Sequence, residues 1–164
     1  MGAAFCSRLS EFYLLMLTIQ SSVLEQIHGA FLRCSNREQG FLLGSKYNLE
    51  QIDICCPLSA MQASMYFISL NAEQTNRQIE QWAAQKICFS GMIHSHVRKK
   101  EDLSEADILF AKQLYHAYSL PFLWFGIGII EQQDVRFKFY KLEQTQSQFS
   151  VSLTDYTIFS HRRM

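Results

Sequence analysis

This chain of 164 residues has little proline, no net charge and no recognisable domain linker. Two prolines occur, and 15 basic residues balance 15 acidic ones, so the formal net charge is zero. Because a protein that wraps a phosphate backbone needs an excess of Lys and Arg, this balance argues against nucleic acid as the main partner. No Gly/Ser/Pro-rich linker, internal repeat or low-complexity tract divides the sequence. The length then predicts one domain.

Long apolar runs near the N-terminus are lacking as well. Residues 12–17 form a short apolar run, well below the roughly 20 residues that span a bilayer. Arg8 is the only basic residue before this run, and the small-residue cleavage site of a signal peptide does not follow it. The sequence therefore predicts a soluble cytoplasmic protein that does not bind a membrane.

The cysteines lack the pattern of a disulfide framework. Their number is odd and no C-x-x-C pair occurs; they are Cys6, Cys34, Cys55, Cys56 and Cys88. Secreted frameworks normally use an even set. We expect small buried thiols in a reducing compartment rather than disulfides, redox centres or metal ligands.

Apolar material, in contrast, is plentiful, with 48% hydrophobic and 13% aromatic residues. Hydrophobic periodicity predicts strands at 14–20, 40–44, 52–56, 65–70, 87–96, 121–130, 135–142 and 149–159. It predicts helices from residue 22 to about 34, from a cap at 71 to about 85, and from 103 to about 118. Interleaved helices and strands around one core indicate an α/β (α+β) single domain over residues 14–164, with a mixed β-sheet flanked by helices. Residues 1–13 are expected to be an N-terminal extension.

Local signals add detail to two of these helices. Ser22, with Glu25 three residues later, has the pattern of a capping box at the start of the first helix. In the second helix, Ile79, Trp82 and Ala83 are expected on the buried side.

The segment around residues 94–107 carries the candidate chemistry. Because side chains two apart on a strand share a face, His94 and His96 can converge on one point. Imidazole pairs are natural zinc ligands, and a carboxylate such as Asp107, early in the next helix, can supply a third. The alternative for the histidines is a pair of solvated side chains on a surface strand.

The start of the following helix also has two interpretations. Ser104 and Asp107 have the S-x-x-D spacing of a capping box. Asp102 with Glu105 offers a rival cap in the same place, and this cap would leave Ser104 and Asp107 free to face the histidines.

Together, residues 94–107 follow the pattern H-S-H-x7-S-x-x-D, which resembles the JAMM motif of the JAB/MPN metalloprotease family. Glu38, ahead of the glycine-bounded apolar run 40–44, resembles the upstream glutamate of that family, and the likeness extends over residues 14–142. Val97 departs from the pattern, since the family usually has proline after the second histidine. The resemblance implies an MPN/JAB-like fold, related to cytidine deaminases, with a curved mixed sheet.

The resemblance also implies a role for each polar residue. His94, His96 and Asp107 would hold Zn²⁺ with a water in the fourth position, which zinc converts to hydroxide at neutral pH. Glu38 would act as general base towards that water and then protonate the leaving amine. Ser104 would donate a hydrogen bond to the oxyanion.

The implied function is that of a zinc-dependent isopeptidase or peptidase that cuts after the C-terminal tail of a ubiquitin-like modifier, in deconjugation or precursor processing. Compact members of this kind resemble prokaryotic JAB proteins encoded beside E1- and E2-like proteins in bacterial conjugation and antiviral defence operons, which are therefore expected partners. Two alternatives remain: trimming of the C-terminus of a sulfur-carrier protein, and a metal-free MPN scaffold.

The segment 59–67 is the candidate for holding the tail. It is rich in small and flexible side chains and precedes a predicted strand, and an extended tail can add as a strand to a sheet edge. An ordinary connecting loop is the alternative. The candidate substrate-binding residues are Ser59, Ala60, Met61, Ala63, Ser64 and Met65.

Overall fold

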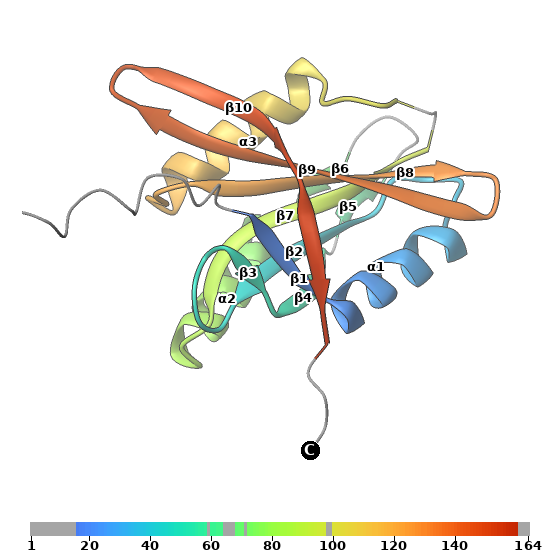
Figure 1. Cartoon of the computed structure of the whole chain (residues 1–164), viewed down its shortest axis with the longest axis horizontal. Coiled ribbons are helices and arrows are strands. Elements are labelled where there is room, and N and C mark those ends of the chain that lie inside the picture. The colour runs from blue at the N-terminus through green and yellow to red at the C-terminus, as the bar shows by residue number, and fades with distance from the viewer. Residues whose placement is uncertain (1–15, 59, 64–67, 71, 98–99, 161–164) are drawn as a thin grey trace, which may run out of the picture.

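The computed structural model describes residues 16–58, 60–63, 68–70, 72–97 and 100–160, so the expected extension at 1–13 lies outside it. The described chain is a single α+β domain with mixed sheets and three helices (Figure 1). Its helices are α1 (Ser21–Arg33), α2 (Ala72–Ala84) and α3 (Glu105–Ala117). Its strands are β1 (Leu17–Gln20), β2 (Gly40–Ser45), β3 (Gln51–Ile52), β4 (Ile54–Pro57), β5 (Ala60–Ala63), β6 (Ile68–Leu70), β7 (Cys88–His96), β8 (Leu123–Glu131), β9 (Asp134–Thr145), β10 (Gln148–Thr154) and β11 (Tyr156–Phe159).

The main sheet has six strands in the order β10-β9-β8-β7-β2-β4. Its strands pair antiparallel except β7 and β8, which run parallel because α3 carries the chain back between them. A second sheet, β11-β1-β3, is parallel, and β5 pairs with β6 in an antiparallel hairpin.

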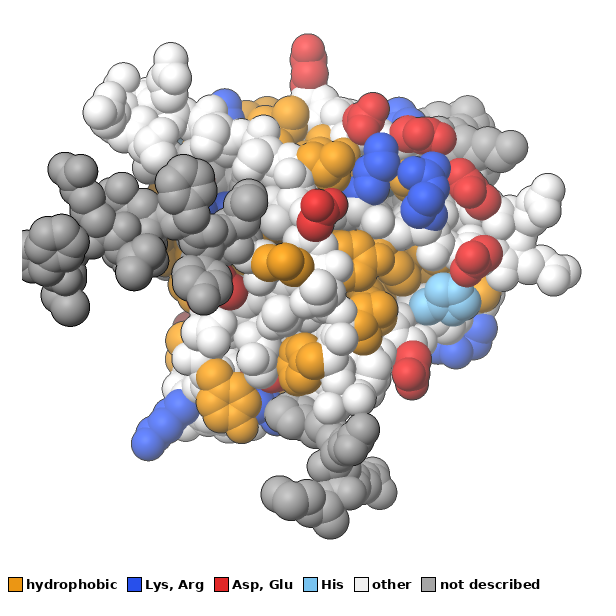
Figure 2. All heavy atoms as spheres, viewed as in Figure 1, with side chains coloured by type: hydrophobic (Ala, Val, Ile, Leu, Met, Phe, Trp, Pro, Cys, Tyr) orange, Lys and Arg blue, Asp and Glu red, His pale blue; other side chains and the backbone are white. Residues whose placement is uncertain are grey.

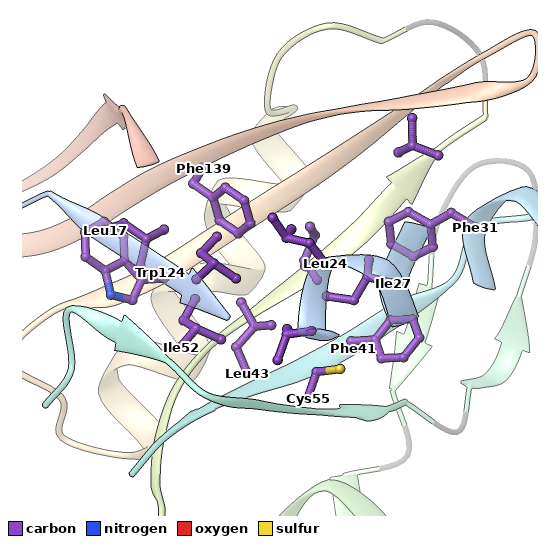
Figure 3. Close-up of a cluster of buried hydrophobic side chains, with 14 of the residues drawn as sticks. Leu17, Leu24, Ile27, Phe31, Phe41, Leu43, Ile52, Cys55, Trp124 and Phe139 are labelled. Carbon is purple, nitrogen blue, oxygen red and sulfur yellow. The ribbon is translucent and has the colours of Figure 1, made fainter. Parts of the chain in front are cut away.

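The core has one layer on each face of the main sheet. One cluster packs the sheet against α1 and includes Phe31, Trp124 and Phe139 (Figure 3). The other packs it against α2 and α3 and includes Trp82 and Phe125. Because β8 is covered on both faces, its sequence is a nearly continuous apolar run, and neighbouring side chains such as Trp124 and Phe125 enter opposite clusters.

A bulge in β7 sets which face its last residues present. Leu43 of β2 pairs with Gly91 but the next residue, Gly44, pairs with Phe89, so Ser90 is one residue too many for its partner strand. The Ser90 hydroxyl donates to the Leu43 carbonyl at 3.1 Å. A Cβ on Gly91 would lie 1.9 Å from the Trp124 carbonyl oxygen, so only glycine fits there. Beyond the bulge, alternate residues of β7 face α3.

Two sequence-based details of the helices are wrong. The helix α1 begins at Ser21 directly after β1, with Gln20 as N-cap and no side-chain cap, so the Ser22–Glu25 box does not form. Ser22 lies inside the first turn there, two residues after the N-cap, so it cannot cap the helix. In α2, Trp82 is buried but Ala83 is exposed, because the buried stripe passes through Thr75, Ile79 and Trp82.

Two predicted strands are each divided by an aspartate. Asp53 separates β3 from β4: its carboxylate accepts hydrogen bonds from the backbone of Lys46 at 2.8 Å and the side chain of Gln51 at 2.7 Å. Asp155 separates β10 from β11, and the two strands belong to different sheets. The predicted strand at 65–70 is described only from Ile68 to Leu70, and β5 was not expected as a strand.

The surface agrees with the balanced composition. On the face shown in Figure 2, basic and acidic side chains are interspersed rather than segregated. Among the described residues, no helix combines the length and apolar character needed to cross a membrane.

Candidate metal centre

The end of β7 brings two imidazoles together in a buried position. His94 is 5% exposed and His96 is 2% exposed, which excludes the pair of solvated surface histidines. Their ring centroids are 4.7 Å apart, and Phe125 of β8 packs edge-on against His94 at 5.5 Å. Strand alternation thus produces the predicted convergence, inside the layer between the sheet and α3.

The first turn of α3 supplies a carboxylate at the same point. Ser104 is the N-cap and forms a capping box with Asp107: the amide and hydroxyl of Ser104 each donate to Oδ2 of Asp107 at 2.7 Å. The other oxygen, Oδ1, lies 3.2 Å from Nε2 of His94. Capping and facing the histidines are therefore compatible. The rival cap does not form, since Asp102 instead contacts Lys138.

The three side chains have the donor set of a metal site. The ligand atoms of His94, His96 and Asp107 lie within 4.8 Å of one another. His94 Nε2 is buried and makes no hydrogen bond with any described residue. His96 Nδ1 lies 2.8 Å from the carbonyl oxygen of Lys100, which can only accept, so the proton sits on Nδ1 and Nε2 is free to ligate. Two imidazoles and one carboxylate fit a tetrahedral cation with one open position.

The carboxylates around His94 favour a positive charge at this site. Burial alone would lower the pKa of His94, but the carboxylates of Asp107 and Glu38 outweigh it, so the pKa is raised. Burial alone would raise the pKa of Asp107, but His94, His96 and the backbone of Ser104 outweigh it and hold the pKa well below its usual range. The carboxyl group is therefore ionised and acts as an acceptor at neutral pH.

Glu38 reaches the histidines from the loop before β2. Its side chain is only 6% exposed, and Oε2 lies 3.9 Å from Nδ1 of His94. Two hydrogen bonds fix the loop: the Gln39 amide donates to the Ser95 hydroxyl, and the Ser95 amide donates to the Gln39 carbonyl, both at 2.8 Å. A carboxylate far away in the sequence is thus placed beside one of the candidate metal ligands, His94.

Ser95 also helps to build this site, although the sequence alone assigned no role to Ser95. It lies between the two histidines, is fully buried, and points to the opposite face of β7. Its position in the H-S-H pattern was the available signal, but its partner, the Gln39 amide, becomes apparent only from the pairing of β2 with β7.

A hollow of about 230 Å³ opens beside Glu38, lined by residues 37–41 and 57–58. Leu58 holds one wall of it against β2: its amide donates to the carbonyl of Gly40 at 2.9 Å, and Gly40 pairs with His94. Of the candidate substrate-binding residues, Ala60, Met61 and Ala63 belong to β5, and Ser59, Ser64 and Met65 lie outside the described residues. Leu58, the last described residue before the candidate segment, thus lines the hollow beside Glu38.

Comparisons with known proteins bear on the fold. No protein-family model and no curated protein matches this chain. Among solved structures, it is similar to the solution structure of protein DSY2949 from Desulfitobacterium hafniense, a structural genomics target. The two share 16% sequence identity at a TM-score of 0.66, and the match covers 90% of this chain and 96% of that one. At this identity the likeness shows a common fold across almost the whole chain.

Proposed function

We propose that the protein is a zinc-dependent peptidase or isopeptidase of the JAB/MPN kind, with the fold of that family. The observation that carries the proposal is that Glu38 lies 3.9 Å from His94, within the group in which His94, His96 and Asp107 converge. Two imidazoles and a carboxylate with a second, non-ligating carboxylate at hand are the parts that a hydrolytic metal centre needs.

His94, His96 and Asp107 would hold the cation. Zn²⁺ bound there would supply a Lewis acid for the scissile carbonyl and lower the pKa of a water molecule to about 7. The chain itself contributes the orientation of the ligands: the Lys100 carbonyl fixes His96, and the Ser104 amide fixes Asp107.

Glu38 would move the proton. It accepts a proton from the attacking water and gives it to the leaving amine, and its buried position keeps the carboxylate away from bulk solvent. Ser104 would stabilise the oxyanion after its hydroxyl turns away from Asp107. Because the Ser104 amide also donates to Asp107 at 2.7 Å, the carboxylate stays in place when the hydroxyl leaves.

The substrate proposed is the C-terminal tail of a ubiquitin-like modifier, alone or conjugated. The hollow beside Glu38 would take an extended chain, and Leu58, which lines it, lies two residues before β5 in the sequence. This choice of substrate, and of E1- and E2-like partners, rests on the sequence resemblance.

Metal content and turnover test the proposal together. Purified protein should retain about one Zn²⁺ per chain, and His94→Ala, His96→Ala and Asp107→Ala should each lose it. On ubiquitin-like fusions and isopeptide conjugates, Glu38→Gln should keep the metal but lower turnover by about 10²–10⁴-fold, since it cannot accept a proton. Full metal occupancy in a double histidine variant would overturn the assignment.

The same experiment separates the alternatives. A scaffold would cut nothing and bind no zinc, whereas a processing enzyme for sulfur carriers would cleave carrier fusions and leave isopeptide conjugates intact. Near wild-type turnover in Glu38→Gln would require another general base.

Hydrogen exchange tests the segment expected to hold the tail. With Glu38→Gln protein saturated by a ubiquitin-like partner, amides across residues 59–70 should exchange more slowly if the tail adds as a strand beside β5. Unchanged exchange there despite measured binding would exclude this docking edge.

A further inference from the structure

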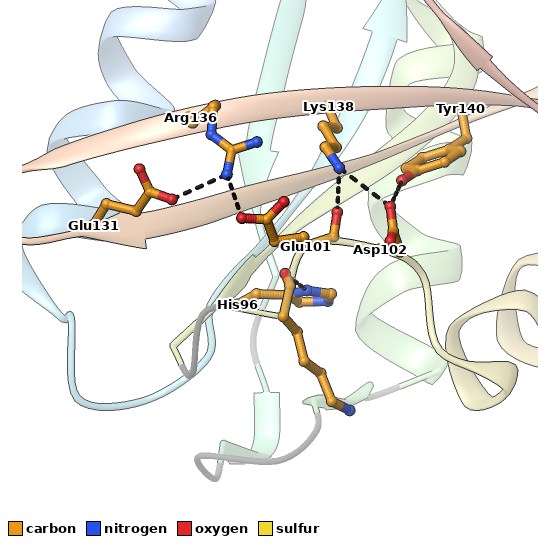
Figure 4. Close-up of polar contacts among 8 residues, drawn as sticks. His96, Glu101, Asp102, Glu131, Arg136, Lys138 and Tyr140 are labelled. Atoms are coloured by element: carbon orange, nitrogen blue, oxygen red, sulfur yellow. Dashed lines mark hydrogen bonds and ion pairs between the residues drawn. The ribbon is translucent and has the colours of Figure 1, made fainter.

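The loop between β7 and α3 is fastened to β9 by three side chains. These are Arg136, Lys138 and Tyr140, which we call the β9 clamp (Figure 4). The loop also contains the Lys100 carbonyl, the hydrogen-bond partner of His96. The clamp therefore holds the peptide segment that orients one candidate metal ligand.

Sheet register places the clamp on the same face as the ligands. Through β8, His94 lies in one cross-strand row with Ile127 and Lys138. His96 lies in the next such row of that face, which ends at Arg136. Because paired residues in a sheet point to the same side, ligands and clamp face the same layer. The loop at 100–102 passes between them.

Lys138 makes the closest contacts in the clamp. Its ammonium group donates to the Glu101 carbonyl at 2.6 Å and to Oδ1 of Asp102 at 3.1 Å. The Tyr140 hydroxyl also donates to Oδ1 of Asp102, at 3.3 Å. The Glu101 carbonyl belongs to the peptide unit next to that of the Lys100 carbonyl, so the position of one constrains the other.

Arg136 is the weaker member of the clamp. It bonds Glu101 at 3.1 Å and Glu131 at 3.0 Å, but its side chain is 42% exposed. The side chain of Lys138 is 20% exposed and donates to a backbone carbonyl, which solvent and salt disrupt less than an exposed ion pair.

We propose that Lys138 is a positioning residue for the metal centre: by holding the Glu101 carbonyl it fixes the Lys100 carbonyl and, through it, the ring of His96. The inference rests on the proposed metal function but concerns a residue two strands away from the ligands. Lys138 itself touches neither the cation nor the substrate.

Zinc affinity, measured by competition with a chromogenic chelator, tests this role. Lys138→Met removes the ammonium group at similar length. It should weaken zinc binding by up to about 10-fold, because it loosens the Lys100 carbonyl without removing it, and full loss of such an outer partner of a ligand costs about 10–100-fold. Lys138→Arg, which can donate to both oxygens, should restore most of the affinity. In the metal-free Lys138→Met protein, amides at 100–103 should exchange faster while the remaining strands keep their protection.

Lys141→Met is the matched control, because Lys141 is also on β9 and pairs with Glu143 at 3.0 Å. It should bind zinc like the wild type. Equal affinity in Lys138→Met and Lys141→Met would overturn the role of Lys138 while leaving the metal centre intact, whereas a wild-type protein that binds no zinc would overturn both. If Lys138→Met does not fold, Asp102→Ala instead removes the carboxylate that Lys138 and Tyr140 share and should weaken zinc binding; unchanged affinity in it would count against the clamp.

Discussion

Ser104 has two expected roles, one structural and one catalytic. It caps α3 and holds Asp107 in the box, and its hydroxyl is the expected donor to an oxyanion. Capping is a contribution to stability, whereas oxyanion binding contributes only to turnover. Substitutions can therefore separate the two.

Three variants at Ser104 should do so. Ser104→Ala should lower the free energy of unfolding by about 1 kcal/mol, and Ser104→Gly by only a few tenths, because glycine is itself an acceptable N-cap. Both should lower turnover by about 10²–10³-fold if the hydroxyl serves the oxyanion. Ser104→Thr keeps the hydroxyl and should stay close to the wild type in both measurements. Turnover that follows stability across the series would assign Ser104 to capping alone.

Ser95 should connect stability with the placement of Glu38. Ser95→Ala leaves the Gln39 amide without its acceptor, which should cost about 1–3 kcal/mol in urea denaturation. Ser90→Ala is the control. The buried hydroxyl of Ser90, also on β7, makes one hydrogen bond to a backbone carbonyl but lies away from Glu38. Only Ser95→Ala should lower turnover at temperatures where both variants are folded. Equal turnover in the two would show that the Gln39–Ser95 contact does not position Glu38.

At the scale of the element, β7 depends on the glycine that follows its bulge. Gly91→Ala brings a Cβ against the Trp124 carbonyl, so the β7–β8 pairing must open, and we expect a loss of about 3 kcal/mol or more. Gly29→Ala in α1 meets only the flexible end of Arg33 and should stabilise the helix by up to about 1 kcal/mol. Thermal unfolding of both variants checks the contrast, and a Gly91→Ala protein as stable as the wild type would contradict the close approach.

Elements with a strong local period were predictable from the sequence. The run 40–44 lies in β2, the run 87–96 covers β7, and the predicted strands at 121–130 and 135–142 correspond to β8 and β9. The split at Asp53 was not predictable, because its carboxylate binds backbone and side-chain groups that a local pattern does not include. The missing cap on α1 has a different cause: β1 continues into the helix without a loop.

The candidate site, too, was predictable from the sequence only in part. Strand alternation predicted that His94 and His96 converge, and the family resemblance implied that Asp107 joins them, which the geometry of the three side chains fits. The Gln39–Ser95 contact and the Lys138 contacts join segments that are far apart in the sequence, and no periodicity contains them. They follow from strand order, which became known only with the fold.

At the scale of the whole molecule, stability should fall in alkaline solution. Burial, and then the neighbouring Cys56, raise the pKa of Cys55 from 9.0 to about 12. Above pH 9 the unfolded chain therefore loses this proton while the native protein keeps it. The unfolded state then binds fewer protons, so the free energy of unfolding decreases as the pH rises from 9 towards 12 and is unaffected below 9.

Urea denaturation across that pH window measures the effect. Cys55→Ala has no thiol to ionise and should show a shallower decline with pH than the wild type, although it is less stable at neutral pH because a buried side chain is shortened. Parallel declines in the two proteins would mean that other groups, such as Tyr140, account for alkaline unfolding.

The pairing of β1 with β11 also has a consequence for biosynthesis. Leu17–Gln20 lies beside Tyr156–Phe159, so the first described strand to leave the ribosome pairs with the last. The β8-β9-β10 meander finds its partners among chain that has just been made, whereas β1 must wait until nearly all of the described chain has emerged. During that wait one edge of β1 lacks its neighbouring strand β11. The helix α1 continues directly from β1, so only its packing on the main sheet holds α1 in place. A stalled or shortened nascent chain would therefore leave one edge of β1 without its hydrogen-bond partner.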